Sequence, residues 1–301
     1  MNVIKHRFIF LGFSGLLVIA SIYGLVAFGL QRSIDFTGGT LWQVQFMAGE
    51  KQPTQSQVRE FVTKELGIVD ATITEQDGLG AFLIKAKEIS EPTHQDYARR
   101  MKQKFGAFTE LSFESIGAAI GSELAHKAYW AFAINLVAIS LYIAYAFRKV
   151  SHPVSSWKYA LITLITLFHD AIIPIGLFAF LGKWSGVEVD INFIIAVLFV
   201  IGFSVHDTIV VFDRIRENLR LGRANEEFGP LVNRSINETF ARSINTSLTL
   251  IVVLFVVYLL GALTLKYFIL AILVGTIAGA YSSIFVASPL LVVWQHRRAV
   301  R

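Results

Sequence analysis

Two pairs of neighbouring ionisable residues lie in apolar stretches of the sequence: His169 with Asp170, and His206 with Asp207. Carboxyl and imidazole groups can bind and release protons, whereas a charge at the centre of a membrane span costs about 2.5 to 3.5 kcal/mol on insertion scales. Each pair is therefore a candidate for proton chemistry. No metal site is expected, because adjacent residues on a helix point apart and no second histidine follows at helical spacing.

Asp207 belongs to a polar stripe on a predicted helix. Ser204 lies one turn before it, Thr208 lies beside it, and Arg214 follows seven residues later on nearly the same face. Two such stripes are expected to meet inside a helical bundle rather than to face lipid. The sequence therefore predicts that Asp207 lies against a second stripe with spacing i, i+3, i+4 and i+7. Its members are Arg242, Asn245, Thr246 and Thr249.

A buried pair of Asp207 and Arg242 allows two interpretations. It is either a static ion pair that fixes helix packing, or a switch, because protonation of the carboxylate leaves the arginine unmatched. A proton that crosses the membrane through Asp207 would release about 2.3 kcal/mol per 100 mV of membrane potential. His206 points about 100° round the helix from Asp207, so it either relays the proton or hydrogen-bonds another neighbour.

The pair His169–Asp170 also has two interpretations. Pro174 lacks an N–H group and leaves the carbonyl of Asp170 without its helical partner, which predicts a kink. An acid and a loosened backbone therefore coincide. The pair is either a second element of a proton path or a polar packing contact.

The elements that carry these residues are expected to cross a membrane. Hydrophobic residues make up 54% of the 301 residues and charged residues 16%, which is unlike an ordinary soluble domain. Gly275 and Gly279 form a GxxxG motif, which predicts close helix packing. Six apolar windows are long enough to span about 30 Å of hydrocarbon as helices. They lie near residues 8–30, 128–147, 157–181, 188–212, 244–265 and 267–294.

The basic residues predict how these helices are oriented. They cluster at both termini, before the third window and after the fourth, whereas the remaining short loops carry only Lys183 and Lys266. The positive-inside rule then places both termini and residues 213–240 in the cytoplasm. The net charge of +5 is thus explained by membrane topology, and no nucleic-acid binding is expected.

Three regions follow from this topology. Residues 1–30 form the cytoplasmic N-terminus and the first span, which is expected to be a retained anchor because its apolar run is about twice that of a signal peptide. Residues 31–127 form an extracytoplasmic domain. Residues 128–301 contain the other five spans, the cytoplasmic loops and the C-terminus. The absence of cysteine from the sequence excludes disulfides and thiolate metal sites.

The extracytoplasmic region has the pattern of a small α+β fold. Thr54 and Thr93 are expected helix N-caps, and Gly67 and Gly106 expected helix ends. The order βαββαβ predicts a ferredoxin-like sandwich, in which His94 is expected on the solvated surface and no catalytic group is predicted. The strands are expected at residues 40–47, 71–76, 81–87 and 108–114, with a turn at 77–78, and the helices at 54–66 and 92–105.

Several ordered motifs together resemble a known family. They are DFTGGT (35–40), ESIG (114–117), HD (169–170), GFSVHDTIVVFDRIREN (202–218), NETFAR (237–242) and NTS (245–247). These motifs, and within them Asp35, Gly38, Gly39, Asp213 and Arg214, are similar to the SecF family of bacterial Sec protein-export subunits, which belongs to the RND superfamily. The resemblance covers nearly the whole chain.

The resemblance implies an RND-type half bundle of six helices in the cytoplasmic (inner) membrane. Such a subunit would use the proton motive force, with SecD and the SecYEG channel, to promote late translocation of preproteins, and YajC or YidC are further implied partners. Protons would be the coupling ion, with no cofactor and no covalent chemistry. Family members are implicated in proton conduction through an acid and an arginine that match Asp207 and Arg242. The residue before that acid is commonly asparagine, so His206 places a titratable group beside it.

Two other functions are alternatives to this one. A half-size RND exporter of small molecules would need a porter domain with a substrate cavity, and residues 31–127 are few for that. A passive scaffold of a channel predicts that the charges within the membrane are dispensable for transport. Replacing Asp207 with asparagine separates these hypotheses.

Overall fold

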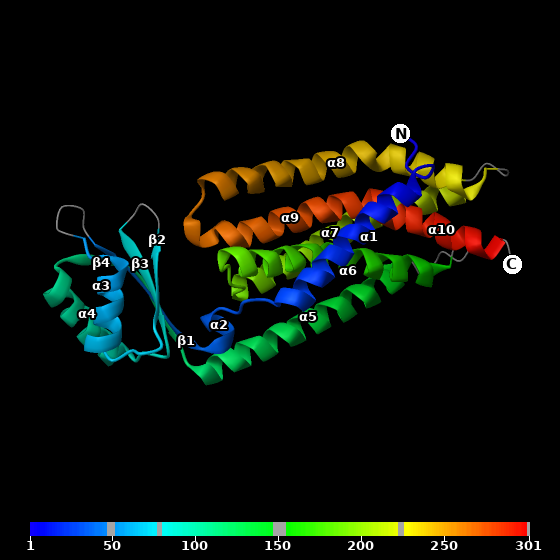
Figure 1. Cartoon of the computed structure of the whole chain (residues 1–301). Coiled ribbons are helices and arrows are strands. Elements are labelled where there is room, and N and C mark those ends of the chain that lie inside the picture. The colour runs from blue at the N-terminus through cyan, green and yellow to red at the C-terminus, as the bar shows by residue number, and fades with distance from the viewer. Residues whose placement is uncertain (47–51, 77–79, 147–154, 222–225, 300–301) are drawn as a thin grey trace. The chain divides into compact units, whose positions relative to one another are not determined.

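The computed structural model describes residues 1–46, 52–76, 80–146, 155–221 and 226–299. The chain forms two compact units, one of Met1–Gln31 with Trp130–Arg301 and the other of Arg32–Tyr129. The first is a bundle of long helices, and the second is a small sheet with helices packed on it (Figure 1).

Long apolar helices dominate the structure and confirm the predicted fold class. In the described ranges, six helical segments are long and apolar enough to cross a membrane, so the chain is a multi-pass membrane protein. The last segment begins with α9 (Lys266–Ser282) and continues through a π-helical turn, η3 (Ser283–Ala287), into α10 (Ser288–Ala299). The other long helices are α1 (Arg7–Phe28), α5 (Ala118–Ala146), α6 (Ser156–Ser185), α7 (Ile191–Arg220) and α8 (Phe228–Leu260).

Helix α7 packs against α6, α8 and α9. Small residues allow the closest approach. A Cβ atom on Gly275 of α9 would overlap the side chain of Val200, and one on Gly279 would lie 3.1 Å from the Cβ of Ser204. The GxxxG motif therefore packs α9 against α7, as the sequence predicts.

The second unit is a ferredoxin-like sandwich, as the pattern of the sequence predicts. Its four antiparallel strands lie in the order β2-β3-β1-β4, and α3 and α4 pack on the sheet (Figure 1). Trp42, Phe46 and Phe82 are buried in the core between these layers. The elements are β1 (Gly39–Phe46), α3 (Gln55–Glu60) with the π-helical η1 (Phe61–Glu65), β2 (Thr72–Gln76), β3 (Ala81–Ala86), α4 (Glu91–Phe105) and β4 (Phe108–Ile116).

The helix ends of this unit confirm one predicted cap and correct another. Thr54 forms a capping box with Gln57 at the start of α3. The expected cap at Thr93 is wrong, because α4 already begins at Glu91 after Ser90, with Pro92 in its first turn, where no hydrogen bond from its nitrogen is needed. Gly67 and Gly106 follow the two helices with φ of 75° and 88°. The predicted turn at 77–78 lies outside the described residues.

His94 is buried, not on the solvated surface as expected. Only 6% of the residue is exposed, and its ring stacks on Phe113 with 3.6 Å between ring centroids. Its Nε2 lies 2.7 Å from a carboxylate oxygen of Glu110, which also accepts a hydrogen bond from the indole of Trp42. The surface prediction failed because this face of α4 lies on β1 and β4, where the stacked ring and the carboxylate compensate for burial of the imidazole.

Candidate functional site

Asp207 lies on the buried face of α7 and contacts α8. The residue is 2% exposed, and its carboxylate accepts a hydrogen bond of 2.8 Å from the hydroxyl of Ser247. Ser204 and Thr208 are buried on the same face of α7. A polar stripe of α7 therefore meets a polar side chain of α8 inside the bundle, but that side chain is not a member of the predicted stripe.

Arg242 is not the residue that meets Asp207. It is exposed on α8, and within the described ranges no ion pair joins it to Asp207. The predicted pairing is therefore wrong in this structure. The physical reason is helical geometry: Arg242 precedes Ser247 by five residues, which places it about 140° round the helix from the side chain that Asp207 contacts.

The other members of the predicted stripe on α8 are exposed as well. Asn245, Thr246 and Thr249 lie on the same side as Arg242, and the two threonine hydroxyls donate to backbone carbonyls of their own helix. The buried face carries a hydroxyl every four residues instead. This hydroxyl row consists of Ser235, Thr239, Ser243 and Ser247. Its signal in the sequence was the four-residue repeat of small side chains, which is typical of helix contacts in membranes.

His206 points away from the acid beside it. Its side chain is 71% exposed, and its Nδ1 lies 3.9 Å from the nearer carboxylate oxygen of Asp207, which is beyond hydrogen-bond distance. The direction agrees with the rotation of about 100° expected between adjacent helical residues. Asp207 thus has a hydroxyl group as its neighbour inside the bundle and an imidazole on its outer side.

A second buried carboxylate lies where three helices meet. Asp170 of α6 is 0% exposed and is bound by the adjacent His169, whose Nδ1 lies 2.8 Å from one carboxylate oxygen. The other oxygen accepts hydrogen bonds from the hydroxyls of Ser204 on α7 and Ser282 on α9. Ser282 was missed in the sequence, because a single serine in an apolar helix gives no signal of its partner.

The DRIREN and NET motifs join the ends of α7 and α8. The guanidinium of Arg214 donates to Glu238 and to Glu217, each at 2.6 Å. The amide of Asn218 donates to the same Glu238 at 2.8 Å and to Ser235 at 2.9 Å. Residues of both motifs thus form one interhelical network. Asp213 forms a separate ion pair with Arg216 of its own helix, at 3.4 Å.

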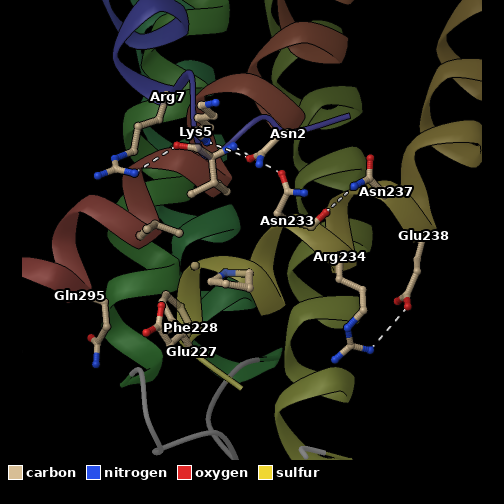
Figure 2. A pocket seen from close by; sticks show the side chains of 14 residues that line it. Asn2, Lys5, Arg7, Glu227, Phe228, Asn233, Arg234, Asn237, Glu238 and Gln295 are labelled. Carbon is tan, nitrogen blue, oxygen red and sulfur yellow. Dashed lines mark hydrogen bonds and ion pairs between the residues drawn. The ribbon is translucent and has the colours of Figure 1, made fainter. Parts of the chain in front are cut away.

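A cavity of about 1080 Å³ opens beside this network (Figure 2). It lies between the start of α8 and the N-terminal residues of the chain, which α8 holds through two asparagine amides. Asn233 and Asn237 both donate to the carbonyl of Met1, at 3.1 and 3.0 Å. The N-terminus is therefore hydrogen-bonded to α8, the helix that carries the hydroxyl row.

The DFTGGT motif forms a close backbone contact. Asp35 lies in the short helix α2 (Ile34–Thr37), which is capped by Ser33. Gly38 and Gly39 follow with φ of 73° and 132°, and a Cβ on Gly38 would lie 2.6 Å from the Cα of Ala118 at the start of α5. Glycine is thus required both by the backbone conformation and by the space.

No group of three or more histidine and acidic side chains that could hold a metal ion occurs in the part of the chain that the structure describes. The two buried carboxylates of the bundle are surrounded by serine hydroxyls and by the imidazole of His169. Such groups exchange protons and hydrogen bonds. The arrangement is therefore suited to binding protons between packed helices.

Comparisons with known proteins show the family to which the sequence is similar. The model of the family "Protein export membrane protein SecD/SecF, C-terminal" matches residues 96–297. The protein translocase subunit SecF of Thermobaculum terrenum is 41% identical, over 100% of this chain and 96% of its own length. SecF of Anaerolinea thermophila is 38% identical, over 98% of this chain and 94% of its own length.

The fold is also that of a solved structure. The crystal structure of SecDF from Thermus thermophilus, described as a translocon-associated membrane protein, matches 99% of this chain with a TM-score of 0.82 and 34% sequence identity. This chain spans 39% of that longer one.

Proposed function

The chain belongs to the SecD/SecF family of protein-export membrane proteins, and from this premise we propose that it is the SecF subunit of a Sec translocase. In this role it uses the proton motive force to promote late preprotein translocation across the cytoplasmic membrane. One observation carries the coupling part of the proposal: Asp207 is a buried carboxylate within a membrane helix, bound to a hydroxyl of a second helix. Protons are the coupling ion, and no cofactor or covalent chemistry is involved.

Because Asp207 is buried, its protonated and ionised states need different surroundings. A protonated Asp207 is neutral and remains hydrogen-bonded to Ser247. An ionised carboxylate removed from water costs several kcal/mol unless a cation or further donors compensate for it. Arg242 is the cation of α8 that a rotation or shift of the helix could bring closer. Binding and release of one proton therefore favour two different arrangements of α7 and α8.

SecD is the partner that we place against the exposed face of α8. Arg242 and Asn245 are exposed on a membrane helix, and polar groups at membrane depth usually face protein rather than lipid. The relative from Thermus thermophilus is named SecDF, and this chain spans 40% of it, so a SecD part has room in the remainder. SecYEG, YajC or YidC, and preproteins are further proposed partners on the ground of family membership.

The proposed orientation places both termini in the cytoplasm and residues 31–127 outside. Its support is the basic charge of the segments that would face the cytoplasm, including Arg214 to Arg234. In this orientation the chain of α7 runs inward, and Asp207 lies in its cytoplasmic half. A proton driven by the membrane potential would reach Asp207 from outside and leave towards the network of Arg214 and Glu238.

Asp207→Asn tests this proposal in cells that contain the partner subunit. We expect loss of the export that depends on the proton gradient, with ATP-driven insertion largely retained, because an amide cannot exchange the proton. Asp213→Asn, at an exposed acid on the same helix, is the control and should export normally. Equal membrane levels of the variants are checked by immunoblotting. Normal gradient-dependent export by Asp207→Asn would refute the mechanism.

The same assay decides between the two interpretations of His206. His206→Asn removes the titratable group and keeps a polar side chain on the outer side of Asp207. A relay through the imidazole predicts a changed pH profile of gradient-dependent export. An unchanged profile would remove His206 from the proton path.

A further inference from the structure

The pair His169–Asp170 is a buried pair of titratable groups in the bundle that the mechanism above does not use. Asp170 has no exposed surface, and both of its carboxylate oxygens are hydrogen-bonded. The contacts come from three helices, α6, α7 and α9, which lie alongside one another (Figure 1). A side chain that only filled space would not need this set of donors.

The environment of Asp170 leaves its charge to be balanced by one neighbour. Within the described ranges no lysine or arginine forms an ion pair with it, and the titratable group in contact is His169. The pair is neutral when it holds one proton, either on the carboxyl group or on the imidazole. The groups that other helices present to the carboxylate of Asp170 are uncharged hydroxyls, those of Ser204 on α7 and Ser282 on α9.

The second nitrogen of His169 is not explained by the contacts of the pair. Nε2 is buried and has no hydrogen-bond partner among the residues that the structure describes, and only 4% of the residue is exposed. A buried polar atom without a partner is rare and requires an explanation. When a proton moves from the Asp170 oxygen to Nδ1, an O–H bond breaks and an N–H bond forms. The carboxylate and imidazolium that result carry opposite charges, so the net charge of the pair does not change.

The backbone around the pair departs from regular helix on two sides. Pro174 lies inside α6 and cannot donate to the carbonyl of Asp170. Helix α9 ends at Ser282, one of the two serines that bind the carboxylate, and continues as a π-helical turn. Such turns are frequent at functional sites. The close approach of Gly279 to Ser204 holds α9 and α7 together at the same level.

Helix α7 connects this pair to Asp207. Ser204 donates to Asp170, and Asp207 follows it by one turn on the same buried face. A shift of α7 that accompanies protonation of Asp207 therefore also changes the hydrogen bond from Ser204 to Asp170. We propose that Asp170, with His169, is a second proton-binding site, coupled to Asp207 through this turn of α7. The proposal rests on the proton-driven function proposed above.

Infrared difference spectroscopy on the full chain with its partner subunit, in lipid, tests the site directly. A pH jump is expected to give carbonyl-stretch bands from two buried carboxyl groups. Asp170→Asn should remove one band and Asp207→Asn the other. The function and the site can thus fail separately: normal gradient-dependent export by Asp207→Asn refutes the function, whereas spectra of Asp170→Asn identical to those of the unaltered chain refute the site.

A second variant keeps the proposal testable where Asp170→Asn folds poorly. His169→Asn leaves the carboxylate and its two serine donors in place, and it should shift the pH profile of gradient-dependent export. Thr166→Val is the matched control, because Thr166 is buried on the same helix and donates only to carbonyls of that helix. A lower thermal stability of His169→Asn with an unchanged pH profile would show that the pair is a packing contact and would overturn the proposal.

Discussion

The two units of the chain differ in where they place carboxylates, because the buried ones of the described residues, Asp170 and Asp207, lie in the bundle. In the α+β unit, ion pairs such as Asp70–Lys87 and Glu60–Lys64 lie at the surface, around an apolar core. In the helical bundle, Asp170 and Asp207 are buried and are bound by serine hydroxyls. Water hydrates any charge on the domain surface, whereas lipid offers no hydrogen bonds, so a membrane helix places its polar groups against other helices. Buried polar contacts of the bundle can therefore respond to protons.

The largest effect is expected where the bundle helices approach most closely. Gly275→Ala should lower the free energy of unfolding by about 3 kcal/mol, because the added methyl group overlaps Val200 of α7 and forces the helices apart. Thermal unfolding in detergent measures the change. Gly202→Ala is the control, since no atom lies within 4 Å of its new methyl group. Equal effects of the two variants would contradict the role given to close packing.

A smaller loss is expected when Asp207 loses its hydroxyl donor. Ser247→Ala should destabilise the bundle by about 2 kcal/mol, because a buried carboxylate is left without its interhelical hydrogen bond. Thr249→Ala on the same helix removes an exposed hydroxyl that bonds only its own backbone and should change stability by less than about 0.5 kcal/mol. Denaturation of both variants in the same detergent provides the measurement. A similar loss in both would mean that the interhelical bond contributes nothing particular.

In the α+β unit, the comparison predicts that local helix signals matter more than buried charges. Thr54→Ala should lower the free energy needed to open α3 by about 1 kcal/mol, because it removes the capping box with Gln57. Thr93→Ala should have a smaller effect, since Thr93 lies within α4 and its hydroxyl contacts only Ser90. Hydrogen exchange of the full chain, resolved by peptide, compares the two helices. A larger effect at Thr93 would restore it as the cap.

The smallest effect is expected at the surface ion pair. The ammonium of Lys87 lowers the pKa of Asp70 by a hydrogen bond. Because the pKa is lower in the folded state, the pair stabilises the fold above the unfolded pKa of the carboxyl group, and this contribution is lost as pH falls through the folded pKa. Lys87→Gln should return the pKa of Asp70 to its ordinary value and barely change stability at neutral pH, because both groups are exposed.

Carboxyl NMR of the full chain labelled at aspartate follows this titration. Lys64→Gln is the control, since Lys64 pairs with Glu60 and leaves Asp70 untouched. If the pKa of Asp70 did not rise in Lys87→Gln, the ammonium of Lys87 would have no electrostatic effect on this carboxyl group.

Most of the fold could be predicted because its signals are local. Apolar windows of sufficient length indicated the six spans, and the alternation of strand and helix patterns indicated the ferredoxin-like order. Thr54 was predictable because a cap and its partner Gln57 lie three residues apart. The N-cap of α4 was not predictable, because Ser90 and Thr93 on either side of Pro92 are both suitable cap residues. The structure shows that the helix begins after Ser90.

The candidate site was predictable only in part. Asp207 and Asp170 were evident because acids in apolar helices are rare. The partner of Asp207 was misidentified because α8 carries two polar faces, and periodicity alone does not decide which one turns inward. The charge of Arg242 favoured the wrong face, whereas Ser247 carries no charge that would have drawn attention to it. Which of the two faces is buried is decided by the packing of α8 against α7 and α9.

The hydroxyl row has one more consequence. Ser235, Thr239, Ser243 and Ser247 repeat every four residues along the buried face of α8, close to the 3.6 residues of one helical turn. A displacement of α8 by four residues, about 6 Å along its axis with a rotation of about 40°, would present Ser243 to Asp207 in place of Ser247. In each of these two positions of α8, a serine hydroxyl can donate to Asp207. The two helices can therefore shift along one another without loss of this type of hydrogen bond.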